Sequence, residues 1–238
     1  MIDLTNKVAL ITGGSKGIGF AIADSLLSQG MRVAITSRDE KNAINAAQEL
    51  SKDTSKIIGI GADVRSLESQ ENAVKKIISH FGQLDVLVAN AGIGHFASIT
   101  ELTPKQWSNT IDTNLTGVFY SVKASLEAIK ASKGYIFTIS SLAGANFFAK
   151  GTAYNASKFG LTGFTQALML DLRQDDVKVT TIMPGSVSSH FGGRSPEDGK
   201  DWRIQPEDIG QLTVDLLKMH PRTLPSKVEV RPSKPLSK

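Results

Sequence analysis

Tyr154 and Lys158 stand four residues apart, which places a phenol and an ammonium one turn apart on one face of a helix. A nearby cation favours the phenolate, so the pKa of Tyr154 is expected to fall from about 10 toward the range of useful proton transfer. Ser141, thirteen residues before Tyr154, could hydrogen-bond the oxygen that exchanges the proton. This set suits acid–base chemistry on a carbonyl or alcohol, although an isolated pair of this spacing is often a solvated surface pair.

A second group of residues could bind phosphates. The apolar run Val8 to Thr12 leads into Gly13, Gly14, Gly17 and Gly19, and a helical pattern follows. Glycines at such a turn let the backbone approach a pyrophosphate, and the helix N-terminus offers amide donors and a positive dipole end. A cluster of glycines can also be a tight turn alone.

Four sequence motifs support this acid–base interpretation. They are the segment Thr12 to Gly19 (TGGSKGIG), the triplet Asn90-Ala91-Gly92, Asn114 within a helical stretch, and Ile139-Ser140-Ser141. In this order and spacing the chain resembles the single-domain type of the short-chain dehydrogenase/reductase family, from about Lys7 to about Gly193. Bacterial carbonyl reductases and 3-oxoacyl-acyl-carrier-protein reductases are the members it resembles.

The elements that must position these residues alternate between β-branched runs and helical patterns, which is typical of parallel βαβ units. Strands are predicted at Val8 to Thr12, Arg32 to Ser37, Lys56 to Gly61, Val86 to Ala89, Gly134 to Ser140, Val177 to Met183 and Val228 to Val230. Helices are predicted at Ile18 to Ser28, Glu40 to Leu50, Leu67 to Phe81, Pro104 to Ala131 and Ala153 to Arg173, with another starting at Gln205 to Asp208. We expect one α/β domain over residues 1–238, a Rossmann-type doubly wound parallel sheet in three α/β/α layers.

Composition limits the class of protein further. The chain has 238 residues, 40% of them hydrophobic, and no cysteine, which predicts one large core without disulfides or cysteine-ligated zinc. No apparent signal peptide or membrane span is present, so we expect a cytoplasmic protein that does not bind membranes. The net charge of +4 is scattered along the sequence, which argues against nucleic-acid binding. No metal-ligand spacing occurs, so no metal site is predicted.

The resemblance implies a set of cofactor-binding positions. They are Gly13, Ser15, Lys16, Gly17, Ile18, Gly19, Ser37, Arg38, Asp63, Val64, Asn90, Ala91, Gly92, Tyr154, Lys158, Pro184, Gly185, Val187 and Ser189. Arg38 after the second strand and Lys16 in the turn favour NADP(H) over NAD(H), because a cation attracts the 2′-phosphate. Asp39 beside Arg38 weakens that argument, and Asn90 could equally tie neighbouring strands together.

The resemblance also implies the catalytic roles. Tyr154 exchanges the proton, Ser141 rather than Ser140 holds the substrate oxygen, and Lys158 also holds the nicotinamide ribose. Asn114 interrupts its helix and positions a water in a proton relay. Residues about 186–205, including the polar stretch His190 to Asp201, are expected to form a substrate lid. The substrate pocket is expected to be shaped by His95, Phe96, Ala145 to Ala149, Met183, Phe191 and Trp202.

The expected activity is NADP(H)-dependent hydride transfer to or from a small carbonyl or alcohol. A 3-oxoacyl thioester is the first alternative substrate, and a non-catalytic NADP-binding sensor is a second reading. The long helices near Pro104 to Ala131 and Ala153 to Arg173 could form the family's dimer contact, giving a homodimer or homotetramer. The basic, proline-containing end from Lys227 to Lys238 departs from the glycine-rich end of many family tetramers. That departure leaves the assembly and the acyl-carrier assignment open.

Overall fold

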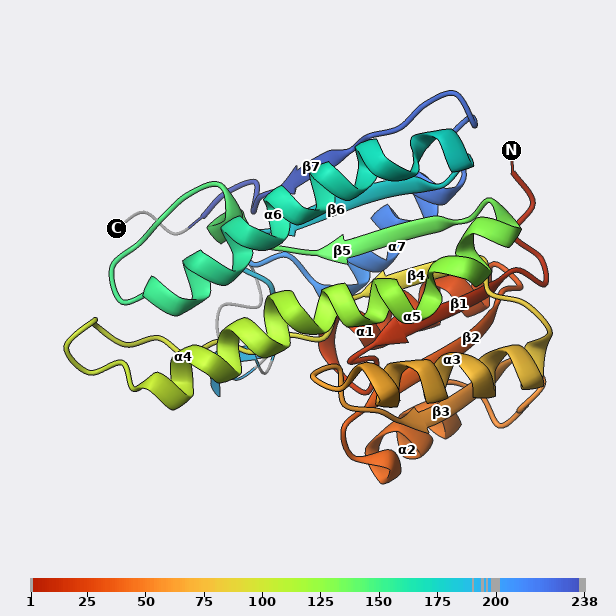
Figure 1. Cartoon of the computed structure of the whole chain (residues 1–238), viewed down its shortest axis with the longest axis horizontal. Coiled ribbons are helices and arrows are strands. Elements are labelled where there is room, and N and C mark those ends of the chain that lie inside the picture. The colour runs from red at the N-terminus through yellow and green to blue at the C-terminus, as the bar shows by residue number, and fades with distance from the viewer. Residues whose placement is uncertain (1, 190, 194, 196, 198–201, 236–238) are drawn as a thin grey trace.

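The structure, a computed structural model, describes residues 2–189, 191–193, 195, 197 and 202–235. Strands and helices alternate along the chain (Figure 1). The strands are β1 (Val8–Thr12), β2 (Arg32–Ser37), β3 (Ile57–Gly61), β4 (Val86–Ala89), β5 (Tyr135–Ile139), β6 (Lys178–Pro184) and β7 (Lys227–Val230). The α-helices are α1 (Gly17–Ser28), α2 (Glu40–Leu50), α3 (Leu67–Phe81), α4 (Pro104–Ile111), α5 (Gly117–Ser132), α6 (Thr152–Leu172) and α7 (Pro206–Leu217).

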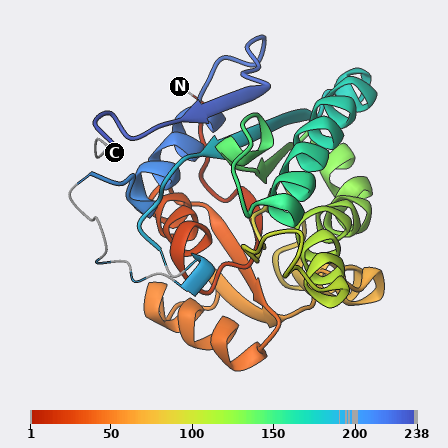
Figure 2. The same cartoon turned by 90° about the vertical axis from the view of Figure 1, so that its left-hand side faces the viewer.

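The strands form one parallel sheet in the order β3-β2-β1-β4-β5-β6-β7. The chain order reverses between β1 and β4, and the crevice at such a switch point is where open α/β sheets bind ligands. Helices α1, α2 and α7 cover one face of the sheet, and α3, α5 and α6 cover the other (Figure 2). The predicted three-layer Rossmann-type fold with seven strands is confirmed.

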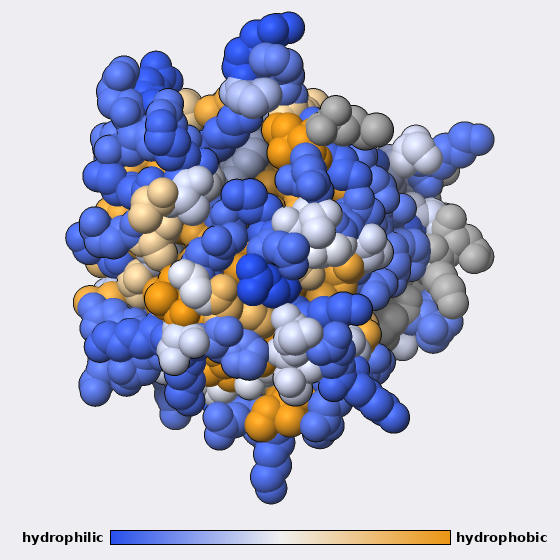
Figure 3. Space-filling view, turned by 90° about the vertical axis from the view of Figure 1, so that its right-hand side faces the viewer, coloured by the Kyte–Doolittle hydropathy of each residue, from blue (hydrophilic) through white to orange (hydrophobic). Residues whose placement is uncertain are grey.

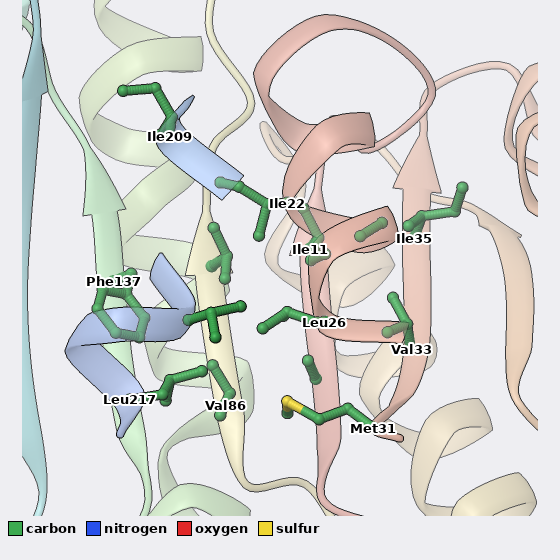
Figure 4. Packing of buried hydrophobic residues seen from close by; sticks show 14 of the residues in the cluster. Ile11, Ile22, Leu26, Met31, Val33, Ile35, Val86, Phe137, Ile209 and Leu217 are labelled. Atoms are coloured by element: carbon green, nitrogen blue, oxygen red, sulfur yellow. The ribbon is translucent and has the colours of Figure 1, made fainter. Parts of the chain in front are cut away.

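The core explains why the strands contain nearly continuous apolar runs. In β1, Ile11 belongs to the cluster packed under α1 and α7, whereas Leu10 belongs to the cluster under α3, α5 and α6. Figure 4 shows Ile22 and Leu26 of α1 packed over the strands of the first cluster. A strand buried on both faces needs apolar residues at both phases of its two-residue repeat.

Several bounds differ from the sequence predictions. Lys56, Gly134, Ser140 and Val177 were predicted to belong to strands but lie outside the observed ones, and β6 extends one residue further than predicted, to Pro184. The predicted helix Pro104 to Ala131 is interrupted at Asn114, as the resemblance implied: α4 and α5 flank a π-helical turn, Asp112–Thr116. A π turn adds one residue to the helical repeat, and here it contains Asn114, whose side chain is bonded to another loop.

The start of α4 agrees with the sequence prediction. The Thr103 hydroxyl accepts a hydrogen bond from the Gln106 amide at 3.2 Å, and the Gln106 side chain accepts one from the Thr103 amide at 3.0 Å. This capping box satisfies donors that the first helical turn would otherwise leave unpaired. The helix that begins here leads directly into the turn that contains Asn114.

The two ends of the sheet differ in character. The carboxyl ends of the strands meet the long loops and α4, the side that faces the viewer in Figure 2. The opposite side, shown in Figure 3, is mainly hydrophilic with scattered apolar residues. No helix among the described residues is long and apolar enough to cross a membrane.

Candidate active site

A cavity of about 1390 Å³ opens at the carboxyl ends of the strands. Eighteen of the predicted residues line it: Gly13, Ser15, Lys16, Gly17, Ile18, Ser37, Arg38, Val64, Asn90, Ala91, Gly92, Ser141, Tyr154, Lys158, Pro184, Gly185, Val187 and Ser189. Three predicted residues, Gly19, Asp63 and Asn114, are not among the lining residues. The predicted phosphate turn and the predicted acid–base residues thus share one space.

The glycine turn needs its glycines for conformation and for close packing. Gly13 and Gly17 have φ of 64° and 59°, which side chains with a Cβ rarely adopt. A Cβ on Gly13 would also lie 2.9 Å from the Cα of Ala91. Gly19 lies behind the turn, where a Cβ would be 2.5 Å from Nδ2 of Asn90. Gly19 therefore lets α1 pack closely on the loop after β4.

Asn90 joins this turn to the end of β4. Its Nδ2 donates to the carbonyl oxygens of Thr12 and Gly13 at 2.9 and 3.0 Å. The Thr12 hydroxyl accepts from the backbone amides of Asn90 and Ala91, both at 3.1 Å. These bonds give Asn90 the strand-tying role that the sequence left open, while the residue still lines the cavity.

Charge is distributed unevenly at the end of the cavity near β2. Lys16 and Arg38 line it, whereas the two nearby carboxylates have other partners. Asp39 caps α2 by accepting from the Lys41 amide at 2.9 Å, and Asp63 pairs with Arg65 at 2.7 Å. The hydrogen bond from Arg65 holds the pKa of Asp63 below its ordinary value, with a smaller contribution from the charge of Arg38. This end of the cavity favours an anion.

The acid–base residues come from α6 and the turn after β5. Lys158 is buried, and its Nζ donates to the carbonyl oxygen of Ile139 at 2.9 Å. Burial lowers the pKa of Lys158 to about 8, because the charged form loses hydration. The Lys158 Nζ lies 5.8 Å from the ring centroid of Tyr154. A lysine with this pKa changes charge near neutral pH.

Ser141 begins a short 3₁₀ turn, Leu142–Gly144. Its Oγ accepts from the Ala143 amide at 3.1 Å, so the hydroxyl hydrogen can be donated into the cavity. Ser140 also lines the cavity, but its Oγ bonds the carbonyl oxygen of Lys158 at 3.3 Å and the Thr162 hydroxyl at 3.2 Å. The two serines are therefore placed differently: Ser140 is engaged with α6, and Ser141 is oriented by its own turn.

Asn114 is fully buried behind the cavity. Its Oδ1 accepts from the Ile93 amide, and its Nδ2 donates to the Ile93 carbonyl oxygen, both at 2.8 Å. The same Nδ2 donates to Ser157 at 3.0 Å, and the Ser157 hydroxyl donates to the Tyr154 carbonyl oxygen at 2.8 Å. Asn114 thus connects three segments of the site. The role of Ser157 was not predicted, because only tertiary contacts reveal it.

Asn155 was also missed by sequence reasoning. Its Nδ2 donates to the carbonyl oxygens of Ala143 and Asn146, both at 2.8 Å, and its Oδ1 accepts from the Phe148 amide at 3.4 Å. These bonds fix the loop between Ser141 and Tyr154 on α6. Within that loop Asn146, Phe147, Phe148 and Ala149 line the cavity and Ala145 does not.

The remaining predictions for the substrate pocket have mixed outcomes. Phe96, Phe191 and Trp202 line the cavity. His95 and Met183 are not among its lining residues, and Met183 is fully buried in β6. Much of the predicted lid, including His190 and residues 198–201, lies outside the described residues. Its described ends meet in a bridge between Val187 and Ile204.

The C-terminal segment reaches the same cavity. Arg231, Pro232 and Pro235 line it, and the Gly185 amide donates to the Val230 carbonyl oxygen at 2.8 Å. A Cβ on Gly185 would lie 3.2 Å from Cδ of Pro232. No local pattern in the sequence predicts that residues after β7 line the cavity, because their position depends on β7 pairing with β6 at the edge of the sheet.

Comparisons with known proteins place this site in a family. The family described as short chain dehydrogenase matches residues 7–199. An uncharacterized oxidoreductase of Staphylococcus saprophyticus is 34% identical over 238 residues, covering 98% of this chain and 100% of the relative. The chain belongs to the short-chain dehydrogenase family and is an oxidoreductase of that family.

Two solved structures are similar in fold and sequence. An alcohol dehydrogenase from Thermococcus sibiricus, complexed with 5-hydroxy-NADP, has a TM-score of 0.91 and 30% identity, covering 98% of this chain and 99% of its own. A metagenomic short-chain oxidoreductase in complex with NADP has a TM-score of 0.84 and 33% identity, covering 98% of this chain and 100% of its own. The family's nucleotide cofactor is therefore supported for this chain.

Proposed function

We propose that the protein is an NADP(H)-dependent oxidoreductase that interconverts a carbonyl group and a secondary alcohol, with Tyr154 as the general acid and base. The single observation that carries the proposal is that Ser141, Tyr154 and Lys158 line the same cavity as the glycine turn. A proton donor and a phosphate-binding turn in one space fit hydride chemistry better than phosphate binding alone.

The residues present fit a nicotinamide dinucleotide. The positive-φ turn at Gly13 and Gly17 leaves backbone room for a pyrophosphate. The Lys158 ammonium donates one hydrogen bond, to the carbonyl oxygen of Ile139, and within the described part of the chain it makes no second one. Its other hydrogens would bind the ribose hydroxyls. When bound, the cofactor would supply the hydride.

Each catalytic side chain then has a defined task. The Ser141 hydroxyl donates a hydrogen bond to the substrate oxygen and orients the carbonyl carbon. The Tyr154 hydroxyl gives its proton to that oxygen during reduction and takes it back during oxidation. The Lys158 ammonium stabilises the phenolate that remains. The bonds of Asn114 to Ile93 and Ser157 hold α6 in place during these steps.

The charges near β2 support the proposed preference for NADP(H). Arg38 and Lys16 line the cavity, while the side chains of Asp39 and Asp63 are held by Lys41 and Arg65. A 2′-phosphate would meet cations there. The carboxylates of Asp39 and Asp63 are engaged by other partners instead of being directed at a ribose hydroxyl. The presence of NADP or an NADP derivative in the two similar structures supports the same choice.

Arg38→Ala should weaken NADPH binding by about 10- to 100-fold, since hydrogen bonds to charged groups contribute about 1.5–3 kcal/mol. NADH binding should change by less than about threefold. Fluorescence titration of each cofactor measures both values. Lys41→Ala is the matched control, because it removes an exposed cation of α2 that does not line the cavity. Equal losses for NADPH and NADH would refute the assignment of Arg38.

The pH dependence of the reaction should report Lys158. Its pKa of about 8 means that the ammonium is present below this pH and lost above it. We expect kcat/KM for NADPH, which reports the free enzyme, to fall about tenfold per unit above about pH 8. Because the folded pKa lies below 10.5, this group's contribution to the unfolding free energy should rise between about pH 8 and 10.5. A rate profile that stays flat to pH 9.5 would contradict this assignment.

Assembly and setting belong to the same proposal. Trp107 on α4, Phe119 on α5, and Phe159 and Leu170 on α6 are 40–55% exposed. A second copy of the chain packed on these helices would cover such apolar side chains, so we propose a homodimer or a homotetramer built from it. A cysteine-free chain suits the cytoplasm, which is the proposed location.

A further inference from the structure

Two phenylalanine rings pack against the hydroxyl-bearing ring of Tyr154, and a third, Phe148, packs against one of them. The centroid of Phe96 lies 5.3 Å from that of Tyr154, and the centroid of Phe191 lies 5.6 Å from it. Phe96 also lies 6.0 Å from Phe148 and 6.4 Å from Phe191. These separations fall within the range of about 4.5–7 Å in which aromatic rings attract one another. The rings come from three separate loops, and all of them line the cavity.

Glycines leave the space that these rings occupy. A Cβ on Gly94 would lie 2.7 Å from Cε1 of Phe191 and 2.9 Å from Cε2 of Phe96. A Cβ on Gly151 would lie 2.7 Å from Cε2 of Phe148. Each ring therefore rests on a backbone position where a side chain would collide with it. This close fit indicates that Phe96 and Phe191 have defined positions beside Tyr154, and that Phe148 has one beside Phe96.

The rings also present apolar surface to the cavity. Phe96 is 40% exposed and Phe148 is 48% exposed, and the neighbouring Phe147 is 88% exposed. Large aromatic side chains that remain exposed in a cleft are typical of a binding surface for an apolar group. Leu142, Ile93 and Trp202 add further apolar side chains to the cavity wall.

The charged side chains of the described cavity wall are all cations. No aspartate or glutamate is among the described residues that line the cavity. The cations Lys16 and Arg38 belong to the end near β2, and Arg231 pairs with Glu229 at 2.7 Å. Lys150, which follows the cluster, also lines the cavity but is exposed to solvent, and Lys158 beside Tyr154 donates to the carbonyl oxygen of Ile139. The rings themselves carry no charge, so a charged substrate group packed against them would lose hydration.

From this arrangement we infer that the site takes an uncharged carbonyl compound with a flat apolar group, an aromatic or unsaturated ring, next to the carbonyl. The inference rests on the proposed function, because it assigns the substrate class of that same site. The flat group lies among Phe96, Phe148 and Phe191, and this contact directs the carbonyl oxygen toward Tyr154 and Ser141. Phe96 and Phe148 are the residues that determine this specificity.

The test compares three carbonyl compounds with NADPH: acetophenone, the small 2,3-butanedione and the anionic pyruvate. We expect kcat/KM to be at least tenfold higher for acetophenone than for 2,3-butanedione, with no detectable turnover of pyruvate. Phe96→Ala and Phe148→Ala should each lower the acetophenone to 2,3-butanedione ratio at least tenfold. The loss should fall mainly on KM for acetophenone, and the dissociation constant of NADPH should be unchanged.

Matched variants separate specificity from folding. Ile99→Ala removes an apolar side chain, 71% exposed, from the loop that carries Phe96 but outside the cavity lining, and it should keep the wild-type ratio. Phe148→Leu keeps apolar bulk and should retain more of the ratio than Phe148→Ala, which covers the case in which the alanine variant fails to fold. Thermal unfolding of each variant identifies that case.

Two results would overturn the inference while leaving the proposed function intact. One is a wild-type preference for pyruvate or 2,3-butanedione, and the other is an unchanged ratio in both folded phenylalanine variants. Absence of NADPH oxidation with every carbonyl would instead refute the proposed function, and the inference with it.

Discussion

Replacing Tyr154 with phenylalanine is expected to lower kcat for carbonyl reduction by about a thousandfold or more. The variant removes the hydroxyl that donates the proton, and general acid catalysis alone contributes about 10²- to 10⁴-fold. The ring itself remains, so its contacts with Phe96 and Phe191 should persist. The measurement is the steady-state rate of NADPH oxidation with the best carbonyl substrate.

Two controls accompany this variant. The dissociation constant of NADPH should change by less than about threefold and the unfolding temperature by only a few degrees, because the lost group is one hydroxyl. A Tyr154→Phe protein that retains a tenth or more of the wild-type kcat would remove Tyr154 from the proposed mechanism. NADPH binding is measured first, because a variant that no longer binds NADPH would lose activity for that reason alone.

The second large effect concerns the two adjacent serines. Ser141→Ala should lower kcat by about 10²- to 10³-fold, since loss of a hydrogen bond to a developing oxyanion costs about this much. Ser140→Ala should change kcat by less than about tenfold and should mainly lower the unfolding temperature. The reason is that the Ser140 hydroxyl is hydrogen-bonded to the backbone carbonyl oxygen of Lys158 and to the Thr162 hydroxyl, which leaves it engaged with α6.

This pair of variants is its own matched control, because the same atom is removed from neighbouring residues that both line the cavity. Steady-state kinetics and thermal unfolding of both proteins give the comparison. Equal losses of kcat, or a larger loss in Ser140→Ala, would show that the thirteen-residue spacing to Tyr154 identified the wrong serine.

Much of the fold follows from local patterns in the sequence. The bounds of β1, β2, β4, α2 and α3 agree with their predictions. Their apolar runs and helical repeats correspond directly to burial: β1 and β4 are buried at every position. For such elements, burial on both faces and a helix cap such as Asp39 or Ser66 leave few alternatives.

Other features depend on contacts between distant segments. The π turn at Asn114 is held by Ile93 and Ser157, which lie 21 and 43 residues away. The positions of Phe96, Phe148 and Phe191 depend on glycines in neighbouring loops. No periodicity encodes such contacts, so the sequence predicted many of the residues that line the cavity but not how they are held.

The charge of Asp39, after β2, is a second case in which the sequence does not show how a side chain is placed. In the sequence Asp39 argued against NADP(H), because a carboxylate after the second strand can bind ribose hydroxyls. The structure shows the Asp39 carboxylate capping α2. The residue type was visible in the sequence, whereas the direction of its side chain was not.

The most direct test of the central claim follows the hydride itself. NADPH carrying deuterium at the transferable position of the nicotinamide is incubated with the protein and a panel of ketones, aldehydes and 3-oxoacyl thioesters. The account predicts that deuterium appears on the carbinol carbon of a product alcohol, and that Tyr154→Phe abolishes this transfer. Tight NADPH binding without deuterium transfer to any carbonyl would contradict it and would favour a sensor that binds NADP without turnover.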